Sequence, residues 1–165
     1  MRDETGKYTM NEAEATLVKA LRSNTYLQCK NRLKGDVYVS DPDSGGQGTY
    51  LPGHCCLGVA CDVVGGTAGW VHDRNYGSWS YGSEYKEGTM PEWLGDKFNW
   101  RMRDDGMLCF HGRDGIRPTL SGCNDAGMTF DQIADVIEFG LVEHNDDPPY
   151  LLYDFFANVD NKAVV

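Results

Sequence analysis

The sequence lacks any apolar run long enough to cross a membrane, which takes about 20 consecutive apolar residues in a helix. Its N-terminal segment, MRDETGKYTMNEAEA, also lacks the apolar stretch of a secretory signal. We therefore expect a protein that does not act in a membrane and that works in the cytoplasm. There its six cysteines would remain reduced thiols.

Positive charge is scarce. The 165 residues contain 15 Lys and Arg against 25 Asp and Glu, a formal net charge of −10. Sequence-independent binding of nucleic acid requires clustered cations that neutralise phosphates, so the charge argues against a nucleic-acid partner and against an anionic membrane surface. An acidic surface suits solubility, a basic partner protein, or mimicry of nucleic acid.

Paired metal-binding motifs are also missing, because no C-x-x-C pair occurs. Cys109 and His111 would share one face of a strand, but a single pair is weak evidence for zinc. We expect neither a metal nor a cofactor. The candidate zinc ligands by residue type are His54, Cys55, Cys56, Cys61, Cys109, His111 and Cys123.

The most informative segment that is present is HCCLGVACDVV, residues 54–64. It is nearly all apolar and lies between Pro52-Gly53 and Gly65-Gly66. A segment that is apolar on every side is normally buried on every side. The pattern therefore predicts a short central helix, in which the adjacent Cys55 and Cys56 point about 100° apart and form no disulfide with each other.

Three segments have the form of a capping box, in which a threonine is followed three residues later by Glu or Gln. They begin at Thr9, Thr89 and Thr129. The first predicts a helix to about Ser23, and the second a short helix that buries Trp93 and Leu94 and ends at Gly95. The third predicts a helix from Phe130 to about Gly140, with Met128 and Ile133 as a hydrophobic staple.

Strands are predicted at Val37–Val39, at Met107–His111 and as a hairpin within Trp70–Tyr85. The glycine-rich segment 40–53 is predicted to be a flexible, exposed loop. Residues 145–165 form an aromatic C-terminal arm that folds back or mediates a homodimer. We expect one α+β domain over residues 1–144, dominated by helices, in which capped helices and a small antiparallel sheet surround the buried cysteine-rich helix.

The order of these segments resembles a family of small uncharacterised proteins from bacteriophages and bacterial genomes. The motifs that carry the resemblance are CCLGVACD (55–62), MPEWLG (90–95) and CNDAGMTFDQIADVIE (123–138). It covers roughly residues 9 to 142. The chain departs from the family pattern in Met90, where leucine is usual, in the glycine-rich segment and in the aromatic tail. The resemblance implies a phage setting and assigns no catalytic residues.

Two interpretations of the cysteines remain open. As a nucleophile at a helix start, Cys55 or Cys56 would use His111 or His72 as its base and Asn124 or Asp125 as the orienting group. As core residues they would simply fill the interior, which is the more common role of cysteine. We favour the core. We likewise favour an Asx turn over an active site for residues 124–127, with Gly127 at positive φ.

A ligand-binding set is the remaining candidate site. Aromatic rings could line a pocket and arginines could meet a phosphate, which would suit a small nucleotide. The plainer and more common alternatives are rings that form the core under a glycine-rich hairpin and arginines on a solvated face. The residues are Trp70, Trp79, Tyr81, Arg101 and Arg103. The preferred function is that of a non-enzymatic phage accessory protein that binds a host or anti-phage defence protein. The alternatives are sequestration of a small nucleotide signal and a cysteine-dependent hydrolase or transferase.

Overall fold

The computed structural model describes residues 9–74, 76–82, 89–98 and 119–140, and these form a small α+β fold. The predicted strand at Met107–His111 and the arm at 145–165 lie outside the described residues. The helices are α1 (Glu12–Leu21), α2 (Cys56–Ala60), α3 (Glu92–Gly95), α4 (Leu120–Asp125) and α5 (Phe130–Gly140). The strands are β1 (Leu27–Gln28), β2 (Lys34–Ser40), β3 (Gly48–His54), β4 (Trp70–Asp73) and β5 (Ser78–Tyr81). Short helical turns occupy η1 (Pro42–Ser44), η2 (Cys61–Gly65) and η3 (Thr67–Gly69).

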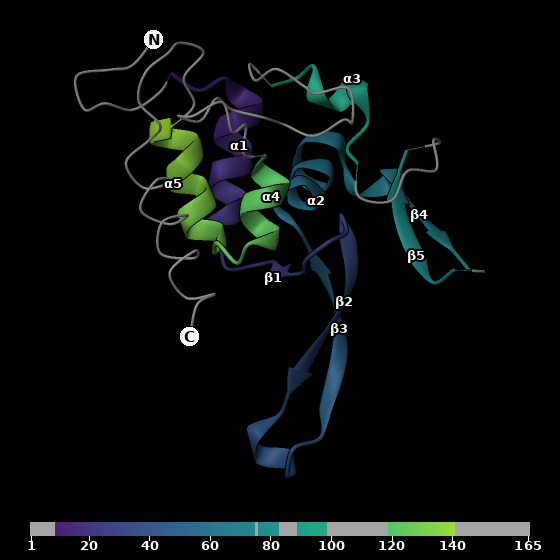
Figure 1. Cartoon of the computed structure of the whole chain (residues 1–165). Helices are drawn as coiled ribbons and strands as arrows, with labels where there is room; N and C mark the ends of the chain where they lie inside the picture. Colours follow the sequence, from purple (N-terminus) through teal and green to yellow (C-terminus); the bar gives the residue numbers. More distant parts are fainter. Residues whose placement is uncertain (1–8, 75, 83–88, 99–118, 141–165) are drawn as a thin grey trace.

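Helix α2 lies at the centre of the molecule, as the sequence predicts. It contacts α1 and α4, and α5 packs on those two helices in turn. Figure 1 shows α2 between this group of helices and the β4–β5 hairpin. Every residue of α2 is buried, and the chain continues directly into the π-helical turn η2. A segment with apolar residues on all sides is thus enclosed on all sides.

Gly58 lets α2 approach the start of β2. A Cβ atom at position 58 would overlap the carbonyl oxygen of Leu33. That same oxygen accepts a hydrogen bond of 3.0 Å from the amide of Cys55. The helix and the strand are therefore fixed to each other by close backbone packing, for which the residue at 58 must lack a side chain.

The sheet that contains β2 and β3 is mixed, with strand order β1-β3-β2. β1 pairs parallel to β3 through Leu27 with Gly53, whereas β2 and β3 run antiparallel along their whole length. The prediction of a flexible loop over residues 40–53 is wrong for Ser40, which ends β2, and for residues 48–53, which belong to β3; only residues 41–47 turn the chain. The glycines and proline obscured this strand, which is stabilised by pairing with β2.

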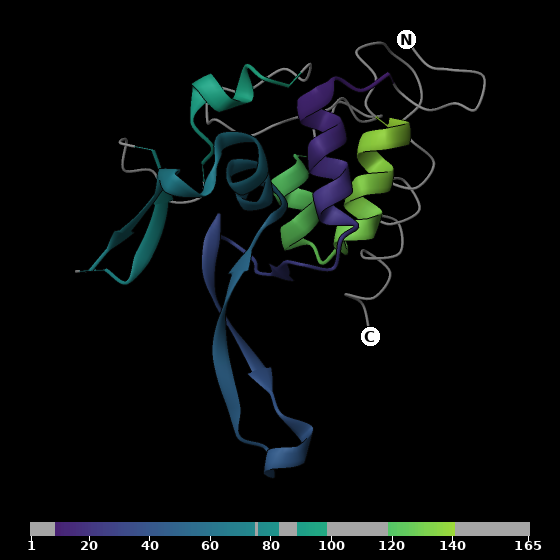
Figure 2. The same cartoon turned by 180° about the vertical axis from the view of Figure 1, so that it is seen from behind.

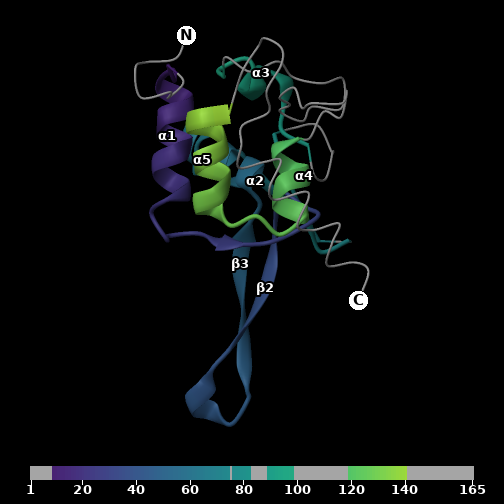
Figure 3. The same ribbon diagram turned by 60° about the vertical axis from the view of Figure 1, so that its left-hand side comes forward.

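Beyond its base, the β2–β3 hairpin leaves the rest of the described molecule. Figures 1, 2 and 3 show it extending away on the side opposite α3. We call residues 35–53 the β2–β3 arm. The second hairpin, β4–β5, is antiparallel as predicted and pairs Trp70 with Tyr81.

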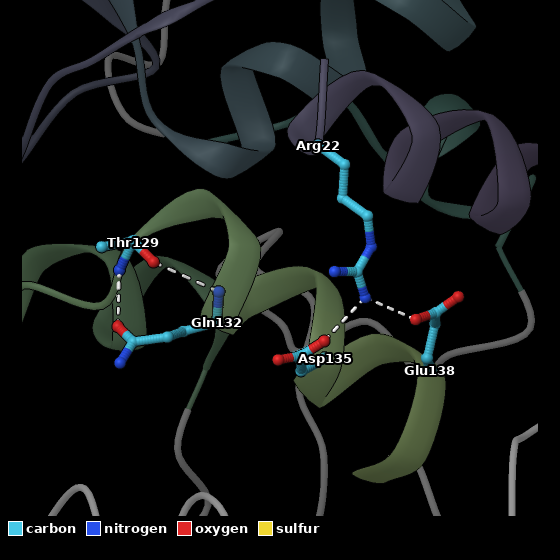
Figure 4. Close-up of polar contacts among 5 residues, drawn as sticks. All are labelled: Arg22, Thr129, Gln132, Asp135 and Glu138. Carbon is cyan, nitrogen blue, oxygen red and sulfur yellow. Dashed lines mark hydrogen bonds and ion pairs between the residues drawn. The ribbon is translucent and has the colours of Figure 1, made fainter. Parts of the chain in front are cut away.

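Helix α5 begins as the sequence predicts. The amide of Gln132 donates to Thr129 Oγ1 at 3.3 Å, and the amide of Thr129 donates to Gln132 Oε1 at 2.9 Å (Figure 4). Met128 and Ile133, the predicted staple, are both buried. Arg22 at the end of α1 adds ion pairs to Asp135 and Glu138, which on this exposed surface contribute little.

The other two predicted capping boxes are wrong. Helix α1 is capped by Asn11, which forms the reciprocal box with Glu14, and it ends at Leu21 rather than Ser23. Asparagine is a stronger cap than threonine, so the later box prevails. Helix α3 has no side-chain cap. Pro91 disfavours the helical conformation at Met90, so the helix starts only after the proline, and Pro91 itself, as N-cap, has no side-chain acceptor. Trp93, predicted to be buried, is 49% exposed.

Helix α4 was not predicted, and the Asx turn at residues 124–127 is wrong. Thr119 caps the helix by accepting from the amide of Gly122 at 2.9 Å. Its end is a Schellman motif: the amide of Met128 donates to the Cys123 carbonyl, and that of Gly127 to the Asn124 carbonyl, both at 3.1 Å. Gly127 has the predicted positive φ, of 99°.

Replacing Gly58 by alanine should destabilise the fold by about 2 kcal/mol or more, because the new methyl group must push α2 away from the Leu33 carbonyl. Urea denaturation measures the change. Gly122→Ala in α4 is the matched control, since its Cβ would meet only the Thr119 hydroxyl, at 3.0 Å, and its cost should stay below about 1 kcal/mol. Equal stability of the two variants would contradict the close packing of α2 on β2.

Candidate functional site

The paired cysteines lie at the start of α2, in the interior. Cys55 is the N-cap residue and only 4% exposed, while Cys56 is fully buried. The Cys56 thiol donates a hydrogen bond to the Leu120 carbonyl at 3.2 Å. A thiol in this role is protonated, and it connects α2 to α4.

Burial also governs the acidity of the other described thiols. It raises the pKa of Cys61 well above its ordinary value and raises those of Cys29 and Cys123 to about 12. The pKa of Cys56 is raised for the same reason, with a further contribution from the neighbouring Cys55. These four groups are neutral near pH 7 and act as small apolar side chains.

Cys55 differs from the other described cysteines. The neighbouring Cys56 side chain lowers the pKa of Cys55, and the backbone amides of Gly58 and Leu57 at the helix start act in the same direction, against the effect of burial. Its sulfur is therefore the best anion site among these thiols. Since the side chain is almost completely covered, a substrate has no access to it in this conformation.

The proposed orienting groups have structural partners. The Asn124 amide is buried, donates to the Cys29 carbonyl at 2.8 Å and accepts from Gln28 Nε2 at 2.8 Å. Asp125 accepts from the amide of Asn31 at 2.8 Å. Both residues thus hold the 28–31 segment against the end of α4, a role that sequence reasoning did not find.

Of the two histidines proposed as bases, the structure describes only His72. His72 is exposed on β4, where its ring lies 4.6 Å from that of Trp79. His111, like Cys109, lies outside the described residues. Within the part of the chain that the structure describes, no three His, Cys, Asp or Glu side chains are grouped so that they could hold a metal ion.

Three of the five residues predicted to bind a ligand are described, and two of them, Trp70 and Tyr81, have rings that contact each other. Trp70 and Tyr81 pack edge to face at 5.0 Å. The Lys34 ammonium lies 5.0 Å from the Trp70 ring and 4.3 Å from the Trp79 ring. The protein's own lysine thus lies on the faces that a ligand would use. Arg101 and Arg103 lie outside the described residues.

Asp62, in η2, links two aromatic side chains of this aromatic cluster by hydrogen bonds. One carboxylate oxygen accepts from Tyr26 Oη at 2.6 Å and the other from Trp70 Nε1 at 2.9 Å. The ring of His54 lies between the same two rings, 5.2 Å from Tyr26 and 5.5 Å from Trp70. Lys34 and His54 are paired where β2 and β3 meet the core. The aromatic cluster therefore holds the base of the β2–β3 arm in place.

The arm itself exposes large side chains. Tyr38 and Tyr50 are paired across the two strands, with their rings 5.3 Å apart, and are 50% and 68% exposed. On the opposite face Leu51 pairs with Val37 and is 39% exposed. Sequence reasoning missed this surface, although Val37-Tyr38-Val39 and Thr49-Tyr50-Leu51 are both strand-forming triplets that could have indicated a hairpin.

Comparison with protein-family models, with curated proteins and with solved structures finds no match for this chain. Among the described helices, none combines the length and apolar character needed to cross a membrane.

The stability of the protein should decrease below pH 6.5 because of His54. Its pKa is lowered from the ordinary value of 6.5, first by burial and then by the nearby Lys34 charge, against a smaller opposing effect of Asp62. Neither ring nitrogen has a hydrogen-bond partner. The unfolded chain therefore binds a proton more readily than the folded one. The stabilisation that comes from the neutral His54 ring is fully present above pH 6.5. As the pH falls below that value, the free energy of unfolding decreases by up to about 1.4 kcal/mol per pH unit.

Urea denaturation at pH 7.5, 6.5 and 5.5 tests this expectation. The variant His54→Phe, which keeps an aromatic ring in the same place, should lose less stability on acidification than the wild type. His72→Phe, at an exposed position, is the control and should follow the wild type. An unchanged pH dependence in His54→Phe would contradict the assignment.

Proposed function

We propose that the protein acts by binding another protein, with the β2–β3 arm as its contact surface. The observation that carries the proposal is the pair of exposed tyrosines on a hairpin that stands away from the core. An isolated two-stranded hairpin is at best marginally stable in water. Here its base is anchored in the aromatic cluster, so the rest of the arm is free to present side chains on both faces.

Exposed aromatic residues favour binding over other roles for this arm. Tyrosine is enriched at protein interfaces, because its ring buries a large area with little loss of side-chain entropy. On the arm, Tyr50, Tyr38 and Leu51 place apolar area on both faces of the ribbon. Clusters of exposed apolar side chains on a projecting element mark interaction sites.

The proposal extends to the biological setting that the resemblance implies. A small acidic phage accessory protein would work in the cytoplasm of the host cell, where it would bind a host component or an anti-phage defence protein and interfere with it. The net charge of −10 agrees with a protein partner rather than nucleic acid.

The geometry favours neither alternative function. For a cysteine-dependent hydrolase, Cys55 and Cys56 would have to be reached by a substrate, yet both are covered. For nucleotide sequestration, the rings of Trp70 and Trp79 would have to receive a base, yet Lys34 lies on both.

Affinity capture from lysate of the natural host tests the proposal, with the wild type and the double variant Tyr38→Ser/Tyr50→Ser as baits. We expect at least one host protein to be retained by the wild type and reduced about tenfold or more on the double variant, since interface tyrosines are frequent hot spots. The control is Tyr76→Ser, at a position that is 83% exposed outside the arm, which should retain the same protein. Identical capture by all three baits would contradict the proposal.

A further inference from the structure

The charges of the arm are all of one sign. Between Gly35 and Gly53 the sequence contains Asp36, Asp41 and Asp43, and neither lysine nor arginine. All three aspartates are exposed. Lys34, the cation at the base, has its ammonium 4.3 Å from the Trp79 ring and thus lies against the β4–β5 hairpin. The arm is therefore an acidic projection.

One face of the arm combines a carboxylate with the tyrosine pair. Residues two apart on a strand point to the same side, so Asp36 shares a face with Tyr38, and the antiparallel register places Pro52 and Tyr50 opposite them. The Tyr38 and Tyr50 rings meet at an interplanar angle of 61°, which leaves ring surface open to solvent. A guanidinium group recognises both features, because it pairs with carboxylates and stacks on aromatic faces.

We propose that the arm binds a basic protein surface that presents arginine, with Asp36 as the ionic partner and the Tyr38–Tyr50 pair as the stacking surface. This inference rests on the proposed function and specifies the partner's chemistry. Charge complementarity selects this occupant over a second copy of the chain, because two copies would bring together net charges of −10 each. The same argument disfavours a nucleic-acid strand.

The test measures binding of a fluorescent peptide of alternating arginine and glycine by anisotropy at low salt, with a lysine-glycine peptide in parallel. The arm variant is Asp36→Asn/Asp41→Asn/Asp43→Asn. The matched body variant is Glu12→Gln/Asp96→Asn/Asp131→Asn, which neutralises as many exposed carboxylates outside the arm. We expect the arm variant to lose about tenfold in affinity for the arginine peptide and the body variant less than about twofold. Equal losses would mean that only the net charge attracts the peptide, which overturns the proposal.

A second variant isolates the tyrosines. Tyr38→Leu/Tyr50→Leu keeps apolar side chains but removes the aromatic faces, and should weaken binding of the arginine peptide about fivefold while changing the lysine peptide less. Equal effects on the two peptides, or none, would overturn the stacking role. Circular dichroism and urea denaturation of each variant verify that it folds; these positions are exposed, so the core is untouched.

Two further outcomes separate this inference from the proposed function. If the wild type captures a host protein through the tyrosines but binds neither peptide, the basic-partner inference fails and the protein-binding function stands. If sedimentation shows a dimer that Tyr38→Leu/Tyr50→Leu dissociates, the occupant of the arm is a second copy and the inference is also overturned.

Discussion

The close contact between α2 and the start of β2 is the constraint on which the rest of the structure depends. Gly58 allows the helix to approach the Leu33 carbonyl closely, and the amide of Cys55 donates a hydrogen bond to the same oxygen. One side of α2 thereby holds the base of the sheet, while other sides are available to α1 and α4. Because a side chain at position 58 would separate helix and strand, the small residues of this segment determine the arrangement of the elements around it.

This arrangement explains why the cysteines are suited to the interior. Cysteine is a small, weakly polar side chain that fills limited space between closely packed elements. Cys56 satisfies its thiol with the Leu120 carbonyl and so adds a polar link to α4 without an unsatisfied group. The lowered pKa of Cys55 is then a consequence of the neighbouring Cys56 side chain and of the backbone amides at the helix start, rather than evidence of exposure to a substrate.

Local signals predicted part of this structure, and the errors have both local and non-local causes. The central helix and the Thr129 cap depend on neighbouring residues, so the sequence predicts them well. The β3 strand depends on pairing with β2, which local composition does not reveal. Helix α4 was not predicted, because Gly122 occupies the position where a capping box that begins at Thr119 would have Glu or Gln. The arm surface was missed for the same reason as β3, whereas the aromatic cluster around Trp70 was anticipated without the lysine that lies on it.

The cysteine-rich segment is thus a closed interior that supports an exposed arm. The most direct test is labelling of the native protein with iodoacetamide at pH 7, read out by peptide mass spectrometry in a Cys109→Ser background. If the segment is closed, modification occurs only at the rate at which the protein unfolds, for each of Cys29, Cys55, Cys56, Cys61 and Cys123. Rapid modification of Cys55 in the folded protein would contradict the claim and favour a catalytic role for that thiol.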